Sequence, residues 1–85
     1  MKVKYSDPAL KQLRKIGKSE AKKIVEYMKE VEKLENPRSR GKALVENLKG
    51  LWRYRVGDWR VLCDINEESI FIEVLRVGHR REVYK

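Results

Sequence analysis

The residues with the clearest chemical potential are arginines that lie close together in the last third of the chain. Arg53 and Arg55 alternate with aromatic residues, and this period of two predicts a strand that carries both arginines on one face. Strand geometry places such side chains roughly 7 Å apart. Arg60 follows a tight turn at Gly57-Asp58, so it must lie beside them on the next strand. Guanidinium groups arranged in this way can bind phosphate.

Lys49 precedes the first of these strands and adds a further cation. Asp58 is the only acidic residue between Lys49 and Arg60. Exposed arginines are common and often have no specific role. Clustered cations repel each other, however, so the fold gains nothing from gathering them unless they bind an anion. The expected phosphate-binding site consists of Lys49, Arg53, Arg55 and Arg60.

A second group of polar residues follows the last predicted strand. Gly78 permits the chain to leave the strand, which would release His79, Arg80, Arg81 and Tyr84 near the strand ends. His79 is the only histidine, and it is either a general acid or base or a structural residue. The Tyr84 ring can stack on a base while its hydroxyl binds a phosphate, or it can pack on the core.

The composition excludes several other kinds of site. Lysine and arginine number 21 against 13 acidic residues, and the net charge of +8 favours a polyanionic partner. With one cysteine, Cys63, and one histidine, a cysteine-rich zinc site is excluded. We expect no metal and no cofactor. No apolar run approaches the ~20 residues of a membrane span, and no signal peptide is visible, so we expect a cytoplasmic protein.

Two predicted helices precede these strands. Residues 1–5 alternate apolar and lysine side chains and predict a short strand. Ser6-Asp7-Pro8 is typical of a helix start, and Gly17 of its end. A second helix follows, with apolar positions three or four residues apart from Ala21 to Leu34, and it ends before Pro37. The pair forms a helical hairpin.

After a polar connection, three strands joined by short turns predict an antiparallel meander. They cover Leu51–Val56, Trp59–Ile65 and Ile70–Val77. Simple alternation along the third strand would put Arg76 on the face of Ile70, Ile72 and Val74. The chain is therefore predicted to be one α+β domain over residues 1–85: a small antiparallel sheet, in the order β-α-α-β-β-β, with a helical hairpin packed on one face.

The sequence resembles the RelE-type toxins of bacterial and archaeal toxin–antitoxin systems, within the wider RelE/ParE superfamily. The resemblance covers nearly the whole chain and is most specific at residues 57–62, GDWRVL, and 77–84, VGHRREVY. It implies a ribosome-dependent mRNA endoribonuclease that acts in the ribosomal A site, on mRNA held against rRNA. It also implies a cognate RelB-like antitoxin and a toxin–antitoxin complex that binds operator DNA.

The resemblance also implies roles for single residues. Arg60 and Arg80 match the two arginines that bind the scissile phosphate, and Tyr84 matches the terminal tyrosine that orients the nucleotide. Arg53 and Arg55 stand where the prototype has lysines. Because arginine essentially cannot act as a base, proton transfer would depend on His79 or Tyr84. The implied reaction is metal-independent attack of the RNA 2′-hydroxyl on the adjacent phosphate, with Arg81 as a further phosphate contact.

Two alternatives remain. The first is a ParE-like toxin of the same fold that inhibits DNA gyrase by binding and lacks the nuclease set of Arg60, Arg80 and Tyr84. The second is a nucleic-acid-binding or interaction module without catalysis. That module would have basic residues dispersed over its surface, whereas a nuclease needs them to converge.

Overall fold

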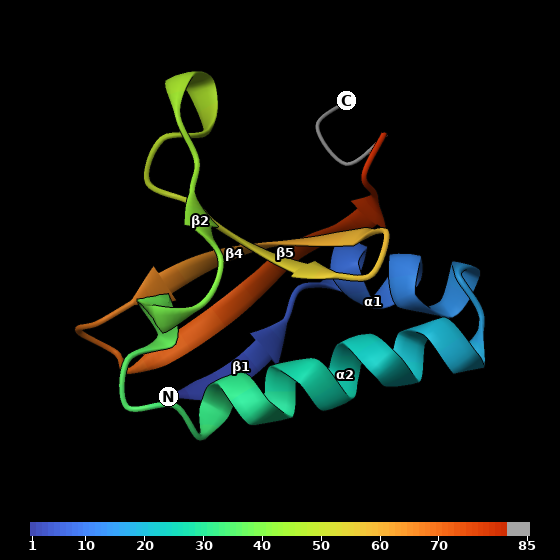
Figure 1. Cartoon of the computed structure of the whole chain (residues 1–85), viewed down its shortest axis with the longest axis horizontal. Helices are drawn as coiled ribbons and strands as arrows, with labels where there is room; N and C mark the ends of the chain where they lie inside the picture. Colours follow the sequence, from blue (N-terminus) through green and yellow to red (C-terminus); the bar gives the residue numbers. More distant parts are fainter. Residues whose placement is uncertain (82–85) are drawn as a thin grey trace.

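Two helices cover one face of a five-stranded sheet (Figure 1). The computed structural model describes residues 1–81. Strand β1 (Lys2–Tyr5) leads into helices α1 (Asp7–Lys15) and α2 (Lys18–Glu32). The following connection contains the short 3-10 helices and one short strand: η1 (Pro37–Ser39), β2 (Lys42–Ala43) and η2 (Glu46–Leu48). The chain then forms β3 (Trp52–Val56), β4 (Trp59–Asn66) and β5 (Phe71–His79).

Ser6 fixes the start of α1 against the sheet. Its hydroxyl accepts a hydrogen bond from the amide of Ala9, as a helix cap does, and donates one to the carbonyl of Leu75 on β5. The helix ends before Gly17, which has a φ of 93° and separates the two helices. The predicted start and end of α1, and the helical hairpin, are confirmed.

The sheet has the strand order β1-β5-β4-β3-β2. The predicted antiparallel meander of β3, β4 and β5 is confirmed, and so is the α+β fold. The sheet as a whole is mixed, however, because β1 pairs with β5 in parallel. The helices and the other strands separate β1 from β5, so no short turn between them imposes an antiparallel direction. A second difference from the predicted sheet is strand β2, which lies in the expected polar connection and pairs with β3.

A β-bulge in β5 changes which residues face the helices. Leu62 pairs with Arg76, whereas the next residue, Cys63, pairs with Val74, so Leu75 is the extra residue. Beyond this bulge the alternation is shifted by one position. Val77 is therefore buried and Arg76 is exposed on the outer face. The expectation that Arg76 shares a face with Ile72 and Val74 is wrong for this reason.

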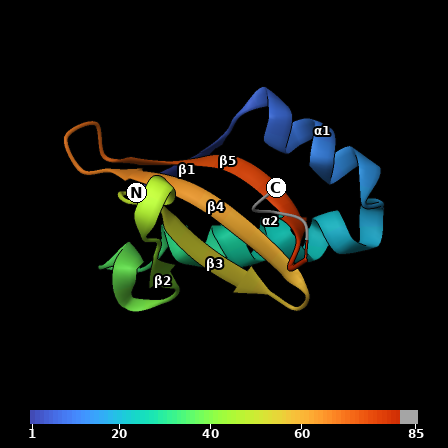
Figure 2. The same cartoon turned by 90° about the horizontal axis from the view of Figure 1, so that it is seen from above.

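The core lies between the helices and the inner face of the sheet, and Figure 2 shows α2 behind the strands. Its fully buried side chains come from both layers: Ala9, Ile24 and Met28 from the helices, and Tyr54, Val61, Cys63, Ile72 and Val74 from the strands. Within residues 1–81, neither helix is long and apolar enough to cross a membrane. The helices do not cover the outer face of the central strands.

Candidate functional site

The outer face of β3 and β4 carries three of the expected cations. Arg55 on β3 pairs directly with Arg60 on β4. Side chains of directly opposed residues project to the same side of a sheet, with Cβ atoms about 4.5–5.5 Å apart. Arg53 lies two residues further along β3 and projects in the same direction. The structure thus brings Arg53, Arg55 and Arg60 together, opposite the face that packs on the helices.

Arg80 is held at the same end of the sheet. Its amide donates a hydrogen bond of 2.8 Å to the carbonyl of Asp58, which lies in the turn between β3 and β4. Two residues earlier, Gly78 pairs with Arg60, and a glycine adds no side chain to this part of the outer face. Arg81 follows and is exposed. The hydrogen bond to this turn therefore holds the backbone of Arg80 next to the Arg55–Arg60 pair.

The charge of the outer face changes along the sheet. Asp64 on β4 pairs with Glu73 on β5, so two carboxyl groups lie side by side away from the arginines. Between the two ends, Arg76 pairs with Leu62 and extends the cationic part. Simple alternation along the strand does not predict Arg76 as a neighbour of the site, because the bulge shifts the register. The cations concentrate towards one end of the face, where a phosphate would be attracted.

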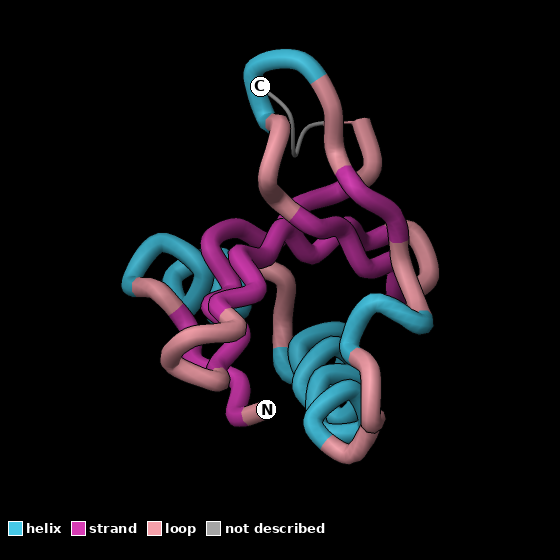
Figure 3. Tube along the Cα trace, turned by 90° about the vertical axis from the view of Figure 1, so that its left-hand side faces the viewer, coloured by secondary structure: helices cyan, strands magenta, loops and turns pink. Residues whose placement is uncertain are grey.

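Lys49 lies in the loop that precedes β3. It follows η2, and its amide donates a hydrogen bond to the carbonyl of Glu46. Figures 1 and 3 show this loop and the end of β5 rising on the same side of the sheet, opposite the helices. Lys49 is exposed and precedes β3, whereas Arg55 lies near the far end of that strand. Tyr84, the expected nucleotide-orienting residue, lies outside the described residues.

His79 occupies the opposite face of the sheet. It pairs with Trp59, and the two rings meet edge to face with centroids 5.8 Å apart. Both residues line a shallow pocket with Gln12, Lys15 and Ile16 of the helical layer. Arg60, the residue after Trp59, projects to the outer face, so Trp59 and its partner His79 face the helices. His79 is therefore not brought together with the arginines.

The titratable groups with raised pKa values lie in the core. Burial is the main cause that raises the pKa of Tyr5 to about 12, and burial also raises the pKa values of Tyr54 and Cys63. These groups are protonated at neutral pH and are not placed on the outer face. Within residues 1–81, no group of three histidine, cysteine or acidic side chains could hold a metal ion. The described residues of the site can bind and stabilise an anion.

A family model for the ParE toxin of the type II toxin–antitoxin system parDE matches residues 3–84. The chain belongs to this family. It is a toxin of the RelE/ParE superfamily, with the fold of the RelE-like toxins. Among curated proteins, no sequence matched significantly.

Solved structures of related toxins share the whole fold. The toxin–antitoxin complex RelBE2 from Mycobacterium tuberculosis matches with 29% identity and a TM-score of 0.83, over 93% of this toxin and 96% of that chain. The RelE–RelB complex from Pyrococcus horikoshii OT3 matches with 24% identity and a TM-score of 0.72, over 96% and 97%. The YoeB/ParE toxin from Agrobacterium tumefaciens has 15% identity and a TM-score of 0.74, over 93% and 98%. The last two likenesses concern the fold alone.

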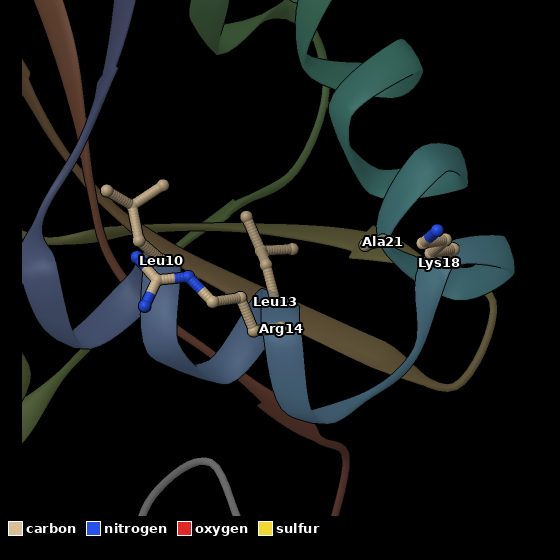
Figure 4. Close-up of a pocket in the computed structure, with 5 residues that line it drawn as sticks. All are labelled: Leu10, Leu13, Arg14, Lys18 and Ala21. Carbon is tan, nitrogen blue, oxygen red and sulfur yellow. The ribbon is translucent and has the colours of Figure 1, made fainter.

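The toxin has a second surface feature on the helical layer. A groove between α1 and α2 is lined by Leu10, Leu13, Arg14, Lys18 and Ala21 (Figure 4). Its floor is apolar, and Leu10 is 37% exposed. Arg14 and Lys18 add positive charge to its lining, and both are exposed. This groove lies on the helices, whereas Arg53, Arg55 and Arg60 project from the opposite face of the sheet.

Proposed function

We propose that this toxin is a ribosome-dependent endoribonuclease that inhibits translation by cutting mRNA in the ribosomal A site. The observation that supports it most directly is the cross-strand pair of Arg55 and Arg60, with Arg80 bonded through its amide to the adjacent turn. The guanidinium groups of Arg55 and Arg60 on the outer face, with the backbone of Arg80 held beside them, suit a phosphodiester that carries a single negative charge. Such a group gains further charge during cleavage, which the cations would stabilise.

In the proposed reaction, the ribose 2′-oxygen attacks the adjacent phosphorus, and the bond from phosphorus to the 5′-oxygen breaks. The products are a 2′,3′-cyclic phosphate and a 5′-hydroxyl. The arginines hold the non-bridging oxygens, and they stabilise the negative charge that grows on them. A base must take the proton of the 2′-hydroxyl, and an acid must donate a proton to the leaving 5′-oxygen. We assign nucleotide orientation to Tyr84, and alignment of the reacting atoms to the ribosome.

Alanine substitutions at Arg60 and Arg80 test this proposal. Each should lower the rate of mRNA cleavage on purified translating ribosomes about 100-fold, the effect expected when one group that stabilises the transition-state charge is removed. Primer extension measures the rate. Arg14→Ala is the matched control, because this exposed arginine lies on α1, away from the outer face, and its variant should cleave like the wild type. Unchanged cleavage in both site variants would contradict the assignment of Arg60 and Arg80 to the phosphate-binding site.

The family match supports a second candidate, inhibition of DNA gyrase by binding. The same basic end of the sheet could then contact an acidic surface or DNA, with no bond broken. A supercoiling assay with the same purified toxin separates the two candidates. If the wild type inhibits supercoiling and leaves ribosome-bound mRNA intact, the toxin is a gyrase inhibitor and the nuclease proposal is wrong.

We further propose that a RelB-like antitoxin neutralises the toxin and that one of its helices docks in the groove between α1 and α2. Several structural relatives were solved as toxin–antitoxin complexes. Leu10 and Leu13 would receive an apolar stripe, while Arg14 and Lys18 would attract flanking acidic residues. The toxin's net charge of +8 favours an acidic partner as a whole.

Two groove variants test this docking mode. Leu10→Glu and Arg14→Glu should each weaken antitoxin binding about 10- to 100-fold in calorimetry, because a carboxylate would face an apolar or acidic segment. The free variants should still cleave mRNA at the wild-type rate. Wild-type affinity in both variants would show that the antitoxin binds elsewhere.

A further inference from the structure

A line of side-chain contacts links helix α2 to the end of β5. It begins at Glu20, whose carboxylate accepts a hydrogen bond of 2.8 Å from the indole Nε1 of Trp59. This bond, more than the nearby Lys23, lowers the pKa of Glu20, so the carboxylate stays ionised and remains a strong acceptor. Trp59 is the first residue of β4, and the bond fixes its ring beneath the strand end.

The line continues from Trp59 to the residues that flank Arg80. The Trp59 ring meets the His79 ring edge to face at an interplanar angle of 85°. The Nδ1 atom of His79 accepts a hydrogen bond of 3.3 Å from the amide of Arg81. The amide of Arg80 is held by the carbonyl of Asp58. Arg80 is therefore fixed on both sides, by its own amide and by the amide that follows it.

Arg80 needs such fixing because the regular sheet ends just before it. His79 is the last residue of β5, and Gly78 gives the backbone additional freedom. Strand ends open more easily than strand centres. On the β1 side of β5, pairing extends only to Val74, and the side chain of Gln12 accepts the amide of Val77 instead, at 2.6 Å. On this side of β5, a side chain from helix α1 thus supplies the hydrogen bond where strand pairing stops.

We propose that Glu20, Trp59 and His79 are positioning residues that hold Arg80 beside the Arg55–Arg60 pair from the opposite face of the sheet. The proposal rests on the proposed function, in which Arg80 binds the scissile phosphate. It gives His79 a defined task, since Nδ1 acts as a hydrogen-bond acceptor for the chain that carries Arg80. Its placement on the helix side matches this task, whereas proton transfer to RNA would require the outer face.

Substitutions at His79 separate positioning from proton transfer. Asparagine places its side-chain oxygen the same number of bonds from Cα as Nδ1, so His79→Asn keeps an acceptor for the Arg81 amide but removes the imidazole. His79→Ala removes both. We expect His79→Asn to cleave ribosome-bound mRNA within about twofold of the wild type, and His79→Ala to be about tenfold slower, the effect of one lost hydrogen bond.

Substitution of Glu20 tests whether helix α2 contributes to the positioning of Arg80. Glu20→Ala removes the acceptor for Trp59 and should slow cleavage about fivefold, although the residue lies on α2. Lys23→Ala is the matched control, because it removes the other partner of Glu20 and leaves the bond to Trp59 in place. It should cleave at the wild-type rate. Wild-type cleavage by Glu20→Ala would overturn the role of α2.

Amide hydrogen exchange distinguishes failure of the positioning role from failure of the nuclease proposal. In the free toxin, the Arg81 amide should exchange at least fivefold faster in His79→Ala than in the wild type or in His79→Asn. Equal exchange in all three would overturn the positioning role, whether or not the wild type cuts RNA. Cleavage by His79→Asn as slow as that of His79→Ala would also overturn it, since the imidazole itself would then be required.

Discussion

At the scale of single residues, Tyr54 joins the core to the site. It lies between Arg53 and Arg55 on β3 and points the opposite way, so burying its ring turns both arginines outward. Its side chain is completely buried, and its hydroxyl donates a hydrogen bond of 2.6 Å to the carbonyl of Pro37. Burial raises the pKa of this hydroxyl, which keeps it protonated as a donor.

Tyr54→Phe should test how much this hydroxyl contributes. The substitution keeps the ring but leaves the Pro37 carbonyl without this donor, and the variant should lose about 1–2 kcal/mol of the free energy of unfolding. Urea denaturation followed by far-ultraviolet circular dichroism measures the change. Cleavage of ribosome-bound mRNA below the denaturation range should remain, because the outward direction of the arginines depends on the ring. A stability equal to that of the wild type would show that the hydroxyl is not needed.

At the scale of elements, the connection between α2 and β3 is packed closely on the edge of the sheet. The indole Nε1 of Trp52 donates a hydrogen bond to the carbonyl of Arg40, and Arg38 lies over the Trp52 ring. Gly41 sits at the tightest point, with a φ of 85°. A Cβ atom there would lie 2.3 Å from the carbonyl oxygen of Arg53, a distance that no packing tolerates.

Gly41→Ala should therefore disturb both the edge strand and the site. The backbone must move to relieve the contact and the positive φ, and we expect a loss of about 2 kcal/mol or more in the free energy of unfolding. Gly17→Ala is the control, because Gly17 has a φ of 93° but no atom within 4 Å of an added Cβ. It should lose only about 1 kcal/mol. Equal losses in the two variants, measured by urea denaturation, would contradict the close contact.

The elements also show how far the sequence can predict this toxin. Helix caps, turns and alternation are local signals, and they were sufficient for the helical hairpin, the meander and the shared face of Arg53, Arg55 and Arg60. The parallel pairing of β1 depends on a strand far away in sequence, so no local signal reports it. The bulge at Leu75 reversed the predicted face of Arg76, because alternation assigns faces only while the register is unbroken. Gly78 was expected to let the chain leave the strand and release His79, but β5 continues to His79, whose side chain lies on the face opposite Arg60.

At the scale of the whole molecule, buried tyrosine hydroxyls and a buried thiol make the free energy of unfolding fall as the pH becomes alkaline. Tyr5 is half-buried, and burial, with smaller contributions from Cys63 and Glu32, raises its pKa from about 10 to about 12. The unfolded chain loses the Tyr5 proton first as the pH rises. The contribution of Tyr5 is therefore fully present below pH 10 and is lost as the pH approaches 12. Tyr54 and Cys63 act in the same direction.

A comparison of the wild type with Tyr5→Phe isolates this contribution. Lysines also lose their charge in this range, which relieves repulsion within a molecule of net charge +8. That effect is common to both proteins and cancels in the comparison. Phenylalanine keeps the ring and has no proton to lose, so the free energy of unfolding of Tyr5→Phe should fall less steeply between pH 10 and 12, by up to about 1.4 kcal/mol per pH unit. Urea denaturation at pH 7, 9 and 11 measures it. Parallel pH profiles would show that Tyr5 ionises equally easily in the folded and unfolded toxin, and that its partial burial against the core does not oppose the charge.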